Sequence, residues 1–371
     1  MLSHSGRYAT HIVGLPNGPL HSNTSKTPEK GPGENWTCRQ LSSSAGDMTA
    51  RLRAGVIGMG SMGANHARVL SSLNDVDLVV VADPALEPAE LHYGAPAVNS
   101  VEKALGFNLD FAVVAVPTAG HEEVALACAG ARVGALIEKP MAHSVDSARR
   151  IRDAFRESEA FAAVGQIERF NPAVSELKNR LDTGFLGPIS QVSSSRQSSF
   201  PSRVKDVGVV RDLATHDLDL TQYIFSCEYE QISAFVAQRS GRDYEDLFVA
   251  SGRLKNGVLV NHVVNWLSPL KERRTTVIGE RGMLTADTAL GDLTFHANGE
   301  ASVDWGTRAE LRGVSEGTSV TFSFDRVEPL KAELAEFAAS VRGVPSARLA
   351  TLDEGADLLE LVQRIVPSQT G

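Results

Sequence analysis

The chain has 371 residues, 42% of them hydrophobic, and a formal net charge of −9. This length accommodates two domains and a large core. An acidic chain without a dense Lys/Arg tract is not expected to bind nucleic acid or an anionic membrane, and no apolar run approaches the roughly 20 residues of a membrane span. Cys38, Cys128 and Cys227 are far apart, which favours reduced thiols in the cytoplasm over disulfides or a zinc site.

Residues 1–47 differ in composition from the rest of the chain. They are rich in Ser, Gly, Pro, Asn and Thr and show little apolar periodicity. Such a segment buries too little surface to offset its ordering entropy, so we expect a disordered tail. It has neither the apolar core of a secretory signal nor the arginine content of a transit peptide. We expect Met48 to be the natural initiator.

The segment from Arg51 to Asp83 is the most informative part of the chain. It contains an apolar run, a glycine-rich turn, a helical pattern and a second apolar run that ends in an acid. Gly58, Gly60 and Gly63 have the spacing that gives a sharp turn, close approach to a pyrophosphate and tight helix–strand packing. The helix that starts there directs its free N–H groups at phosphates.

Asp83 lies where a carboxylate can accept hydrogen bonds from an adenosine ribose and repel a 2′-phosphate. An ordinary glycine turn is the alternative, but the two flanking runs and the acid favour an NAD site, with NADP disfavoured. The predicted cofactor contacts in this segment are Gly58, Gly60, Ser61, Met62, Gly63 and Asp83.

Apolar runs alternate with amphipathic stretches up to about Gly165, which predicts a parallel, doubly wound sheet. The runs are nearly continuous, as in strands covered on both faces. We expect an NAD-binding Rossmann domain over 48–170. Its predicted strands are 54–57, 78–82, 111–116, 135–137 and 162–164, and its predicted helices are 62–73, 101–105, 122–131 and 145–157.

The pattern changes after Asn171-Pro172. Alternating runs are separated by turn signals, among which Asn256-Gly257 is a strong hairpin signal. We therefore expect an α+β domain over 171–371 with a largely antiparallel open sheet and two closing helices. Its predicted strands are 189–194, 232–237, 247–254, 258–266, 275–279 and 282–286, and its predicted helices are 173–182, 329–342 and 353–365.

The tripeptide Glu138-Lys139-Pro140 directly follows the run 135–137. Ligands of open parallel sheets bind outside the carboxyl ends of the strands, so the tripeptide is expected at the cofactor crevice. Lys139 can donate a hydrogen bond to a reacting hydroxyl, and the proline permits a cis peptide bond. A surface pair capping a strand is the alternative. Pro117, Thr118 and His121, after another predicted strand, are also expected to line the cofactor groove.

Asp212, His216 and Asp219 are spaced to share one face of a helix, while Leu213, Leu220 and Ile224 form an apolar stripe. Flanking carboxylates would orient the histidine and raise its pKa, as a general base near neutral pH requires. A solvated helix face with local ion pairs is the alternative. A metal site is disfavoured because the spacing matches no ligand set.

Arg169 and Asn171 lie in the segment Gly165–Pro172, where the first predicted domain ends. They are candidates to contact nicotinamide, ribose or substrate, and equally to pin the turn between the domains. Five further cations are candidates for a substrate diphosphate, with ordinary solvated surface as the alternative. They are Arg203, Lys205, Lys271, Arg273 and Arg274.

Taken in order, the glycine turn, "EKP", "GQIERFNP" and the helix from Asp212 to His216 resemble the glucose-fructose oxidoreductase / inositol dehydrogenase (Gfo/Idh/MocA) family. The resemblance covers nearly everything after about Arg53. It implies an N-terminal Rossmann domain, a C-terminal α/β domain whose open sheet often forms an oligomer interface, and hydride transfer between NAD(P) and a sugar or cyclitol carbon. By position, Lys139 matches the substrate-activating lysine, His216 the acid/base and Asp212 its companion.

Within that family, "VGQIERFNPAV", "FPSRVKDVGVVRDLATHDLDL" and "VNWLSPLKERR" are similar to members described as UDP-N-acetylglucosamine 3-dehydrogenases. The resemblance implies oxidation of a nucleotide sugar at its C3 hydroxyl and a homodimer or homotetramer in the cytoplasm. The expected substrate ligands are Lys139, Arg169, Asn171, Arg203, Lys205, Asp212 and His216. Open alternatives are a cyclitol or simple-sugar dehydrogenase, a ketosugar reductase of a deoxysugar pathway, and a non-catalytic dinucleotide sensor.

Overall fold

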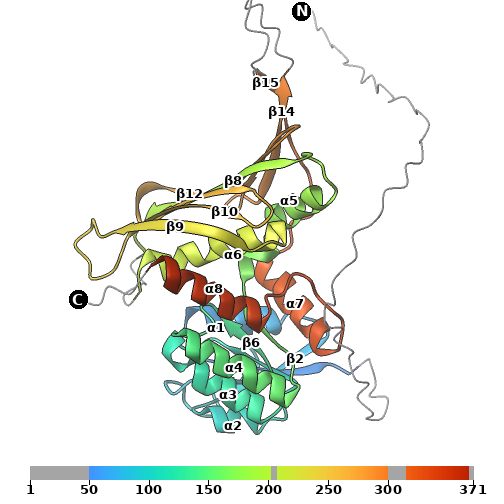
Figure 1. Ribbon diagram of the computed structural model, residues 1–371. Helices are drawn as coiled ribbons and strands as arrows, with labels where there is room; N and C mark the ends of the chain where they lie inside the picture. The colour runs from blue at the N-terminus through green and yellow to red at the C-terminus, as the bar shows by residue number, and fades with distance from the viewer. Residues whose placement is uncertain (1–49, 202–206, 300–314, 367–371) are drawn as a thin grey trace, which may run out of the picture. The chain divides into compact units, whose positions relative to one another are not determined.

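The computed structural model describes residues 50–201, 207–299 and 315–366, which form two β-sheets with helices packed against them (Figure 1). The tail predicted at 1–47, the expected initiator Met48 and the cations Arg203 and Lys205 lie outside the described residues. Within the described ranges, no helix has the length and hydropathy that a membrane span requires.

The first sheet has seven strands in the order β3-β4-β2-β1-β5-β6-β7. All neighbouring strands are parallel except β3 and β4, which confirms the predicted doubly wound sheet. The strand order reverses between β1 and β5, and such a reversal leaves a ligand crevice outside the carboxyl ends of the strands. The strands are β1 (Leu52–Ile57), β2 (Val76–Ala82), β3 (Leu91–His92), β4 (Ala95–Val98), β5 (Phe111–Val114), β6 (Gly134–Glu138) and β7 (Ala162–Gly165).

Helices cover this sheet in two groups with separate apolar cores. Side chains of α1 (Ser61–Leu70) and α7 (Pro329–Val341) share one core. Side chains of α2 (Val101–Leu105), α3 (His121–Gly130) and α4 (Val145–Ser158) share the other, together with the start of α8 (Leu352–Ile365). The first of the two closing helices, α7, thus packs on the first sheet, although its sequence position had assigned it to the second predicted domain.

The second sheet has eight strands in the order β15-β14-β13-β12-β8-β11-β10-β9, all antiparallel except the pair β8 and β11. This confirms the predicted, largely antiparallel architecture. The helices α5 (Pro172–Asp182) and α6 (Thr215–Phe225) contribute to the core of this sheet, as does the second half of α8. The strands are β8 (Ile189–Ser199), β9 (Tyr229–Ala237), β10 (Leu247–Leu254), β11 (Leu259–Asn265), β12 (Leu267–Gly279), β13 (Gly282–Asp287), β14 (Asp292–Gly299) and β15 (Ser315–Thr321).

Four strands were not predicted from the sequence: β3, β4, β14 and β15. The strand β3 is only two residues long, and β4 carries a proline within a four-residue run. In β14, Leu293, Phe295 and Ala297 alternate with polar residues, a period-two pattern that the predicted elements did not include. The short strands β3 and β4 are paired because neighbours supply their hydrogen-bond partners, which local sequence does not reveal.

Candidate active site

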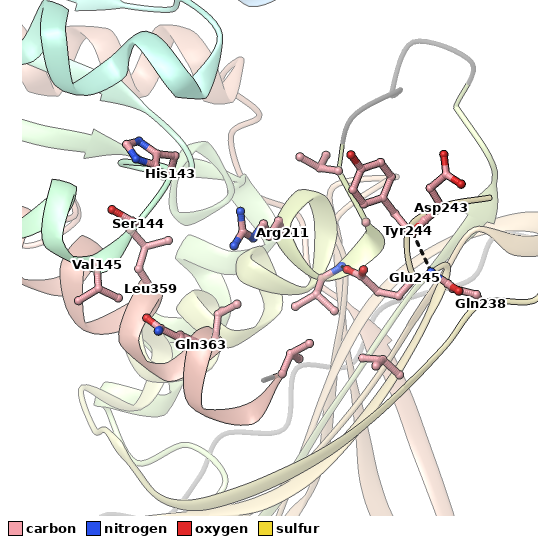
Figure 2. Close-up of a pocket in the computed structure, with 16 residues that line it drawn as sticks. His143, Ser144, Val145, Arg211, Gln238, Asp243, Tyr244, Glu245, Leu359 and Gln363 are labelled. Carbon is pink, nitrogen blue, oxygen red and sulfur yellow. Dashed lines mark hydrogen bonds between the residues drawn. The ribbon is translucent and has the colours of Figure 1, made fainter. Parts of the chain in front are cut away.

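A cleft of about 1090 Å³ lies at the carboxyl ends of β1 and β5, where the strand order predicts a ligand site. A second cavity of about 600 Å³, shown in Figure 2, adjoins it. Val207 and Arg211 line both cavities. Most predicted site residues line the first cleft: Gly58, Gly60, Ser61, Met62, Asp83, Pro117, Thr118, His121, Glu138, Lys139, Asp212 and His216.

The glycine turn forms one wall of the cleft, and its geometry requires glycine at positions 58 and 63. Gly58 has φ +93°, which favours glycine, and a Cβ at Gly63 would lie 1.8 Å from the Gly58 carbonyl oxygen. A Cβ at Gly60 would meet no atom within 4 Å, because this position faces open space. The helix α1 starts at the next residue without a side-chain cap or an acidic residue in its first turn. Its N–H groups therefore remain available to a pyrophosphate.

Asp83 stands beside this turn at the end of β2. Its carboxylate accepts hydrogen bonds from the backbone N–H groups of Met59, at 2.8 Å, and Ala85, at 2.9 Å. These bonds fix the carboxylate next to the turn, where the adenosine ribose of a dinucleotide would bind. The uncapped helix, the open space at Gly60 and the fixed carboxylate together fit NAD.

Lys139 and Asp212 meet at the opposite wall. The Lys139 ammonium donates to the backbone carbonyl of Asp212 at 2.8 Å and to its carboxylate at 3.1 Å. The Lys139–Pro140 peptide bond is cis. Asp212 Oδ2 and His216 Nδ1 are both buried without a hydrogen-bond partner among the described residues. A buried polar atom without a partner costs about 1–3 kcal/mol, which a substrate hydroxyl in the cleft can relieve.

The segment that carries these residues is not the regular helix that its spacing predicted. Residues Val210–Ala214 form a π-helical turn that continues into α6. Asp212 contacts Lys139, whereas the Asp219 carboxylate accepts hydrogen bonds from Arg169 at 2.6 and 2.9 Å. The prediction that Asp219 acts beside His216 is therefore wrong. A buried arginine from another element engages it instead.

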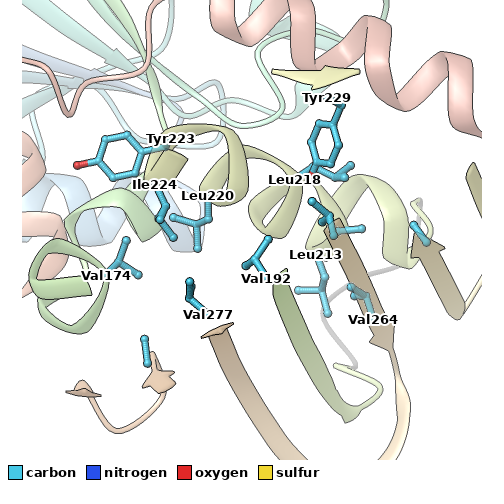
Figure 3. Close-up of a cluster of buried hydrophobic side chains, with 14 of the residues drawn as sticks. Val174, Val192, Leu213, Leu218, Leu220, Tyr223, Ile224, Tyr229, Val264 and Val277 are labelled. Atoms are coloured by element: carbon cyan, nitrogen blue, oxygen red, sulfur yellow. The ribbon is translucent and has the colours of Figure 1, made fainter. Parts of the chain in front are cut away.

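The apolar stripe of the same segment behaves as predicted. Leu213, Leu220 and Ile224 are buried against the second sheet, beside Val192 and Val277 (Figure 3). On the same helix, the carboxylates of Asp217 and Asp219 pair with arginines from distant parts of the sequence, Arg196 and Arg169 respectively.

Four charged side chains form a network of ion pairs that includes Asp217 of α6. We call them the Arg196 cluster: Glu168, Arg196, Asp217 and Arg273. Arg196 is 3% exposed and pairs with Asp217 at 2.7 Å and Glu168 at 3.0 Å. Arg273 pairs with Glu168 at 3.1 Å. Burial alone would raise the pKa of Glu168, but the charges of Arg196 and Arg273 outweigh it and lower that pKa. The Glu168 carboxylate is therefore ionised at neutral pH.

The environment of His216 contradicts the expectation that flanking carboxylates raise its pKa. Burial lowers the pKa of His216 well below 6.5, and the positive charges of Lys139, Arg196 and Arg273 lower it further. The nearby carboxylates are paired with these cations. The imidazole is consequently neutral at physiological pH, which is the form that accepts a proton.

Arg169 and Asn171 do not line the cleft. Arg169 is 2% exposed and forms ion pairs with Asp219 and Glu354. Asn171 donates to the Thr288 carbonyl at 2.9 Å and caps α5. Both side chains are committed to internal contacts, so the geometry favours the second of the two alternatives, that they pin the chain between the sheets.

The remaining candidates differ in their placement. His121 lines the cleft, but its two ring nitrogens contact the carbonyls of Val116 and Pro140, so it ties two loops together. Arg273 lines the cleft within the Arg196 cluster, whereas Lys271 and Arg274 are exposed and are not among the lining residues of the two cavities. The sequence pattern missed Glu168 and Arg211, both of which line the cleft.

Two family models match the chain. Residues 52–166 match the oxidoreductase family with an NAD-binding Rossmann fold, and residues 174–285 match the GFO/IDH/MocA C-terminal domain. The chain belongs to the Gfo/Idh/MocA oxidoreductase family. The predicted resemblance is thereby confirmed, as are its fold and its NAD-binding Rossmann half.

Curated members of the Gfo/Idh/MocA family are similar to this chain along part of their length. Inositol 2-dehydrogenase 2 of Saccharopolyspora erythraea is 30% identical over 224 residues, which cover 57% of this chain and 65% of that relative, just under two thirds of its length. UDP-N-acetylglucosamine 3-dehydrogenase of Acidithiobacillus ferrooxidans is 29% identical over 256 residues, which cover 68% of this chain and 79% of the relative.

A solved structure of the latter enzyme, GnnA from Acidithiobacillus ferrooxidans, superimposes with a TM-score of 0.71 at 24% identity. The superposition covers 85% of this chain and 96% of that one. At this identity the similarity supports the Gfo/Idh/MocA fold, and it carries no information on substrate.

Proposed function

We propose that this protein is an NAD-dependent dehydrogenase that oxidises a hydroxyl group of a sugar, with a nucleotide sugar as its substrate. The observation that carries the proposal is the contact between Lys139 and Asp212, beside His216, in the cleft that the glycine turn also lines. The expected cofactor-binding turn and the expected acid–base residue thus line the same cleft. When bound, NAD supplies the hydride acceptor for the carbon that bears the hydroxyl.

In this proposal each residue of the opposite wall has a distinct role. His216 accepts the hydroxyl proton, because its environment keeps the imidazole neutral. The Lys139 ammonium donates a hydrogen bond to the same oxygen and stabilises the negative charge that develops there. Asp212 holds Lys139 in place and offers its unpaired Oδ2 to a neighbouring sugar hydroxyl.

The nucleotide-sugar assignment is supported by the relative named a UDP-N-acetylglucosamine 3-dehydrogenase, with oxidation at the C3 hydroxyl. A cyclitol is the second candidate, because other similar proteins are named inositol 2-dehydrogenases. A dinucleotide sensor without catalysis is disfavoured, since a sensor has no chemical need for the Lys139 and His216 pair.

A substrate screen tests the proposal. The full chain is incubated with NAD and with nucleotide sugars, free sugars or inositols, and NADH is followed by its absorbance. We expect activity on UDP-N-acetylglucosamine or a close relative. Activity on inositol or a free sugar, with none on nucleotide sugars, would favour the second candidate. NADH formation from none of these compounds would contradict both.

The Lys139→Met variant provides the matched control for the screen. We expect it to lose at least about a hundredfold in rate, because the oxyanion loses its donor. NAD affinity, measured by fluorescence titration, should change little, since lysine acts on the reacting oxygen. A variant that keeps more than a tenth of the wild-type rate would show that Lys139 is structural.

We also propose that the protein acts in the cytoplasm as a homodimer or homotetramer. The second sheet supports the assembly, because apolar side chains are exposed on several of its strands: Phe235, Val249, Leu259 and Ile278. Exposed apolar side chains gathered on one sheet favour an interface. Light scattering by the full chain would measure the assembly directly.

A further inference from the structure

We propose that the second cavity, shown in Figure 2, receives the nucleoside of a nucleotide sugar whose sugar lies in the cleft. The inference rests on the proposed function and specifies how its substrate is recognised. A single ligand then extends through both cavities, with the sugar at Lys139 and His216, the phosphates beside Arg211 and the base beyond it.

The two cavities are connected through shared residues. Val207 and Arg211 line both, and Arg211 is the sequence neighbour of Asp212, which holds Lys139. A ligand that reaches past Arg211 from the reacting hydroxyl therefore enters the second cavity. The cavity volume of about 600 Å³ falls within the range of about 300–1,000 Å³ that small-molecule sites occupy.

Arg211 suits a phosphate at the junction. Its side chain is exposed, points toward the side of the cavity that His143 and Ser144 line in Figure 2, and forms no ion pair with the residues that the structure describes. A guanidinium without a carboxylate partner is a ready donor for phosphate oxygens. Other cations beside the cleft, such as Arg273, are already paired.

The lining of the second cavity suits a nucleobase better than a further phosphate. Its apolar part comes from Val210, Val236, Leu359 and Val362, which can contact the face of a heterocycle. Gln238, Tyr244 and Gln363 supply polar groups for its edge, and aromatic side chains stack on bases.

Two carboxylates in the same lining disfavour a second anion. Glu245 accepts a hydrogen bond from the Val210 N–H at 3.2 Å and so stabilises the start of the π-helical turn. Asp243 lies on the exposed β9–β10 hairpin. Neutral bases carry N–H groups that such acceptors can bind, whereas a second phosphate would be repelled.

Calorimetric titration of the full chain with UDP and with uridine tests the inference. NAD is present at saturation, so that neither probe binds in the cofactor site. Gln363→Trp places a bulky side chain in the cavity and should weaken the binding of both probes at least tenfold. Arg211→Ala should weaken the binding of UDP at least tenfold and the binding of uridine less than threefold, because only UDP carries phosphates.

Two matched variants control for nonspecific effects. Arg364→Trp places the same side chain on the next, exposed residue of α8, outside the lining of this cavity. Arg253→Ala removes a surface guanidinium from β10. We expect both to bind UDP within twofold of the wild type. Circular dichroism melting of all four variants verifies that each is folded.

The binding experiment tests the nucleoside site independently of whether the protein oxidises a nucleotide sugar. Failure of UDP, dTDP and GDP to bind, or UDP binding unaffected by Gln363→Trp, overturns the inference even if a nucleotide sugar is oxidised. Binding that Gln363→Trp abolishes supports the inference even if no sugar is oxidised. The last five residues of the chain are the alternative occupant of the second cavity, and a variant truncated after Val366 tests them. Binding of UDP to the truncated variant but not to the full chain would overturn the inference.

Discussion

The two walls of the cleft are built by different physical means. The cofactor wall is backbone geometry: Gly58 at positive φ, Gly63 in contact with the turn, and an uncapped helix start. The catalytic wall is a set of side chains held by buried charges, with Arg196 and Arg169 as the central cations. The first wall is specified within about thirty residues of sequence, whereas the second needs partners up to 185 residues apart.

This difference determines how each wall should fail. A steric change in the backbone wall should cost cofactor affinity and leave the second half of the protein folded. Removal of one charged side chain from the catalytic wall should lower the free energy of unfolding of the whole protein, because the remaining partners are buried without a counter-charge. We expect the largest single effect in the charged wall.

Arg196→Met should destabilise the protein by about 3–5 kcal/mol, because it leaves Asp217 and Glu168 as buried carboxylates without their main partner. Chemical denaturation followed by circular dichroism measures the loss. Arg253→Met is the control, since its pair with Glu230 is about half exposed and should contribute at most about 1 kcal/mol. Equal losses in the two variants would contradict the role of the cluster.

Gly63→Ala should weaken NAD binding at least about a hundredfold, which corresponds to about 2.7 kcal/mol. The added Cβ would lie 1.8 Å from the Gly58 carbonyl oxygen, so the turn must move. Fluorescence titration with NAD measures the effect. Gly130→Ala, where a Cβ meets no atom within 4 Å, should bind NAD normally. Unchanged affinity in Gly63→Ala would mean that the turn does not hold the cofactor.

His216→Asn should lower the rate about a hundredfold, as expected for removal of a general base. The pH dependence gives a further test. The pKa of His216 is lowered well below 6.5, so the neutral form dominates at neutral pH and is lost only as the pH falls further. Wild-type activity should therefore stay constant down through pH 6.5 and decline below it.

The pH profile of the His216→Asn variant should lack this acidic decline. His296→Asn, at a more distant histidine on β14, should keep both the rate and the profile. A wild-type inflection at or above pH 6.5 would indicate that burial and the surrounding cations do not lower the pKa of His216, or that another group is the base.

Asp83→Ser should narrow the preference for NAD over NADP about tenfold, because a carboxylate near a 2′-phosphate costs about 1–3 kcal/mol. The values of kcat/KM for both cofactors measure the change. Asp77→Ser, on the same strand and paired with Arg51 at the surface, should leave the preference unchanged. Wild-type protein that uses NADP as well as NAD would contradict the assigned role of Asp83.

The sequence alone determined the elements whose signal is local. The glycine spacing, the acid at the end of β2 and the continuous apolar runs predicted the parallel sheet and its ligand crevice, because each depends on steric rules within one βαβ unit. The stripe of Leu213, Leu220 and Ile224 predicted the buried face of α6 for the same reason. The family resemblance added roles for Lys139 and His216, which remain proposals.

Only the tertiary structure decided which charges meet. Their i and i+7 spacing placed Asp212 and Asp219 on one helical face, yet the π-helical turn and the buried Arg169 separate them. Burial lowers the pKa of His216, and the charges of Lys139, Arg196 and Arg273, which come from three distant strands or loops, lower it further. Electrostatic interactions act through space and depend on burial, so no local pattern in the chain encodes their outcome.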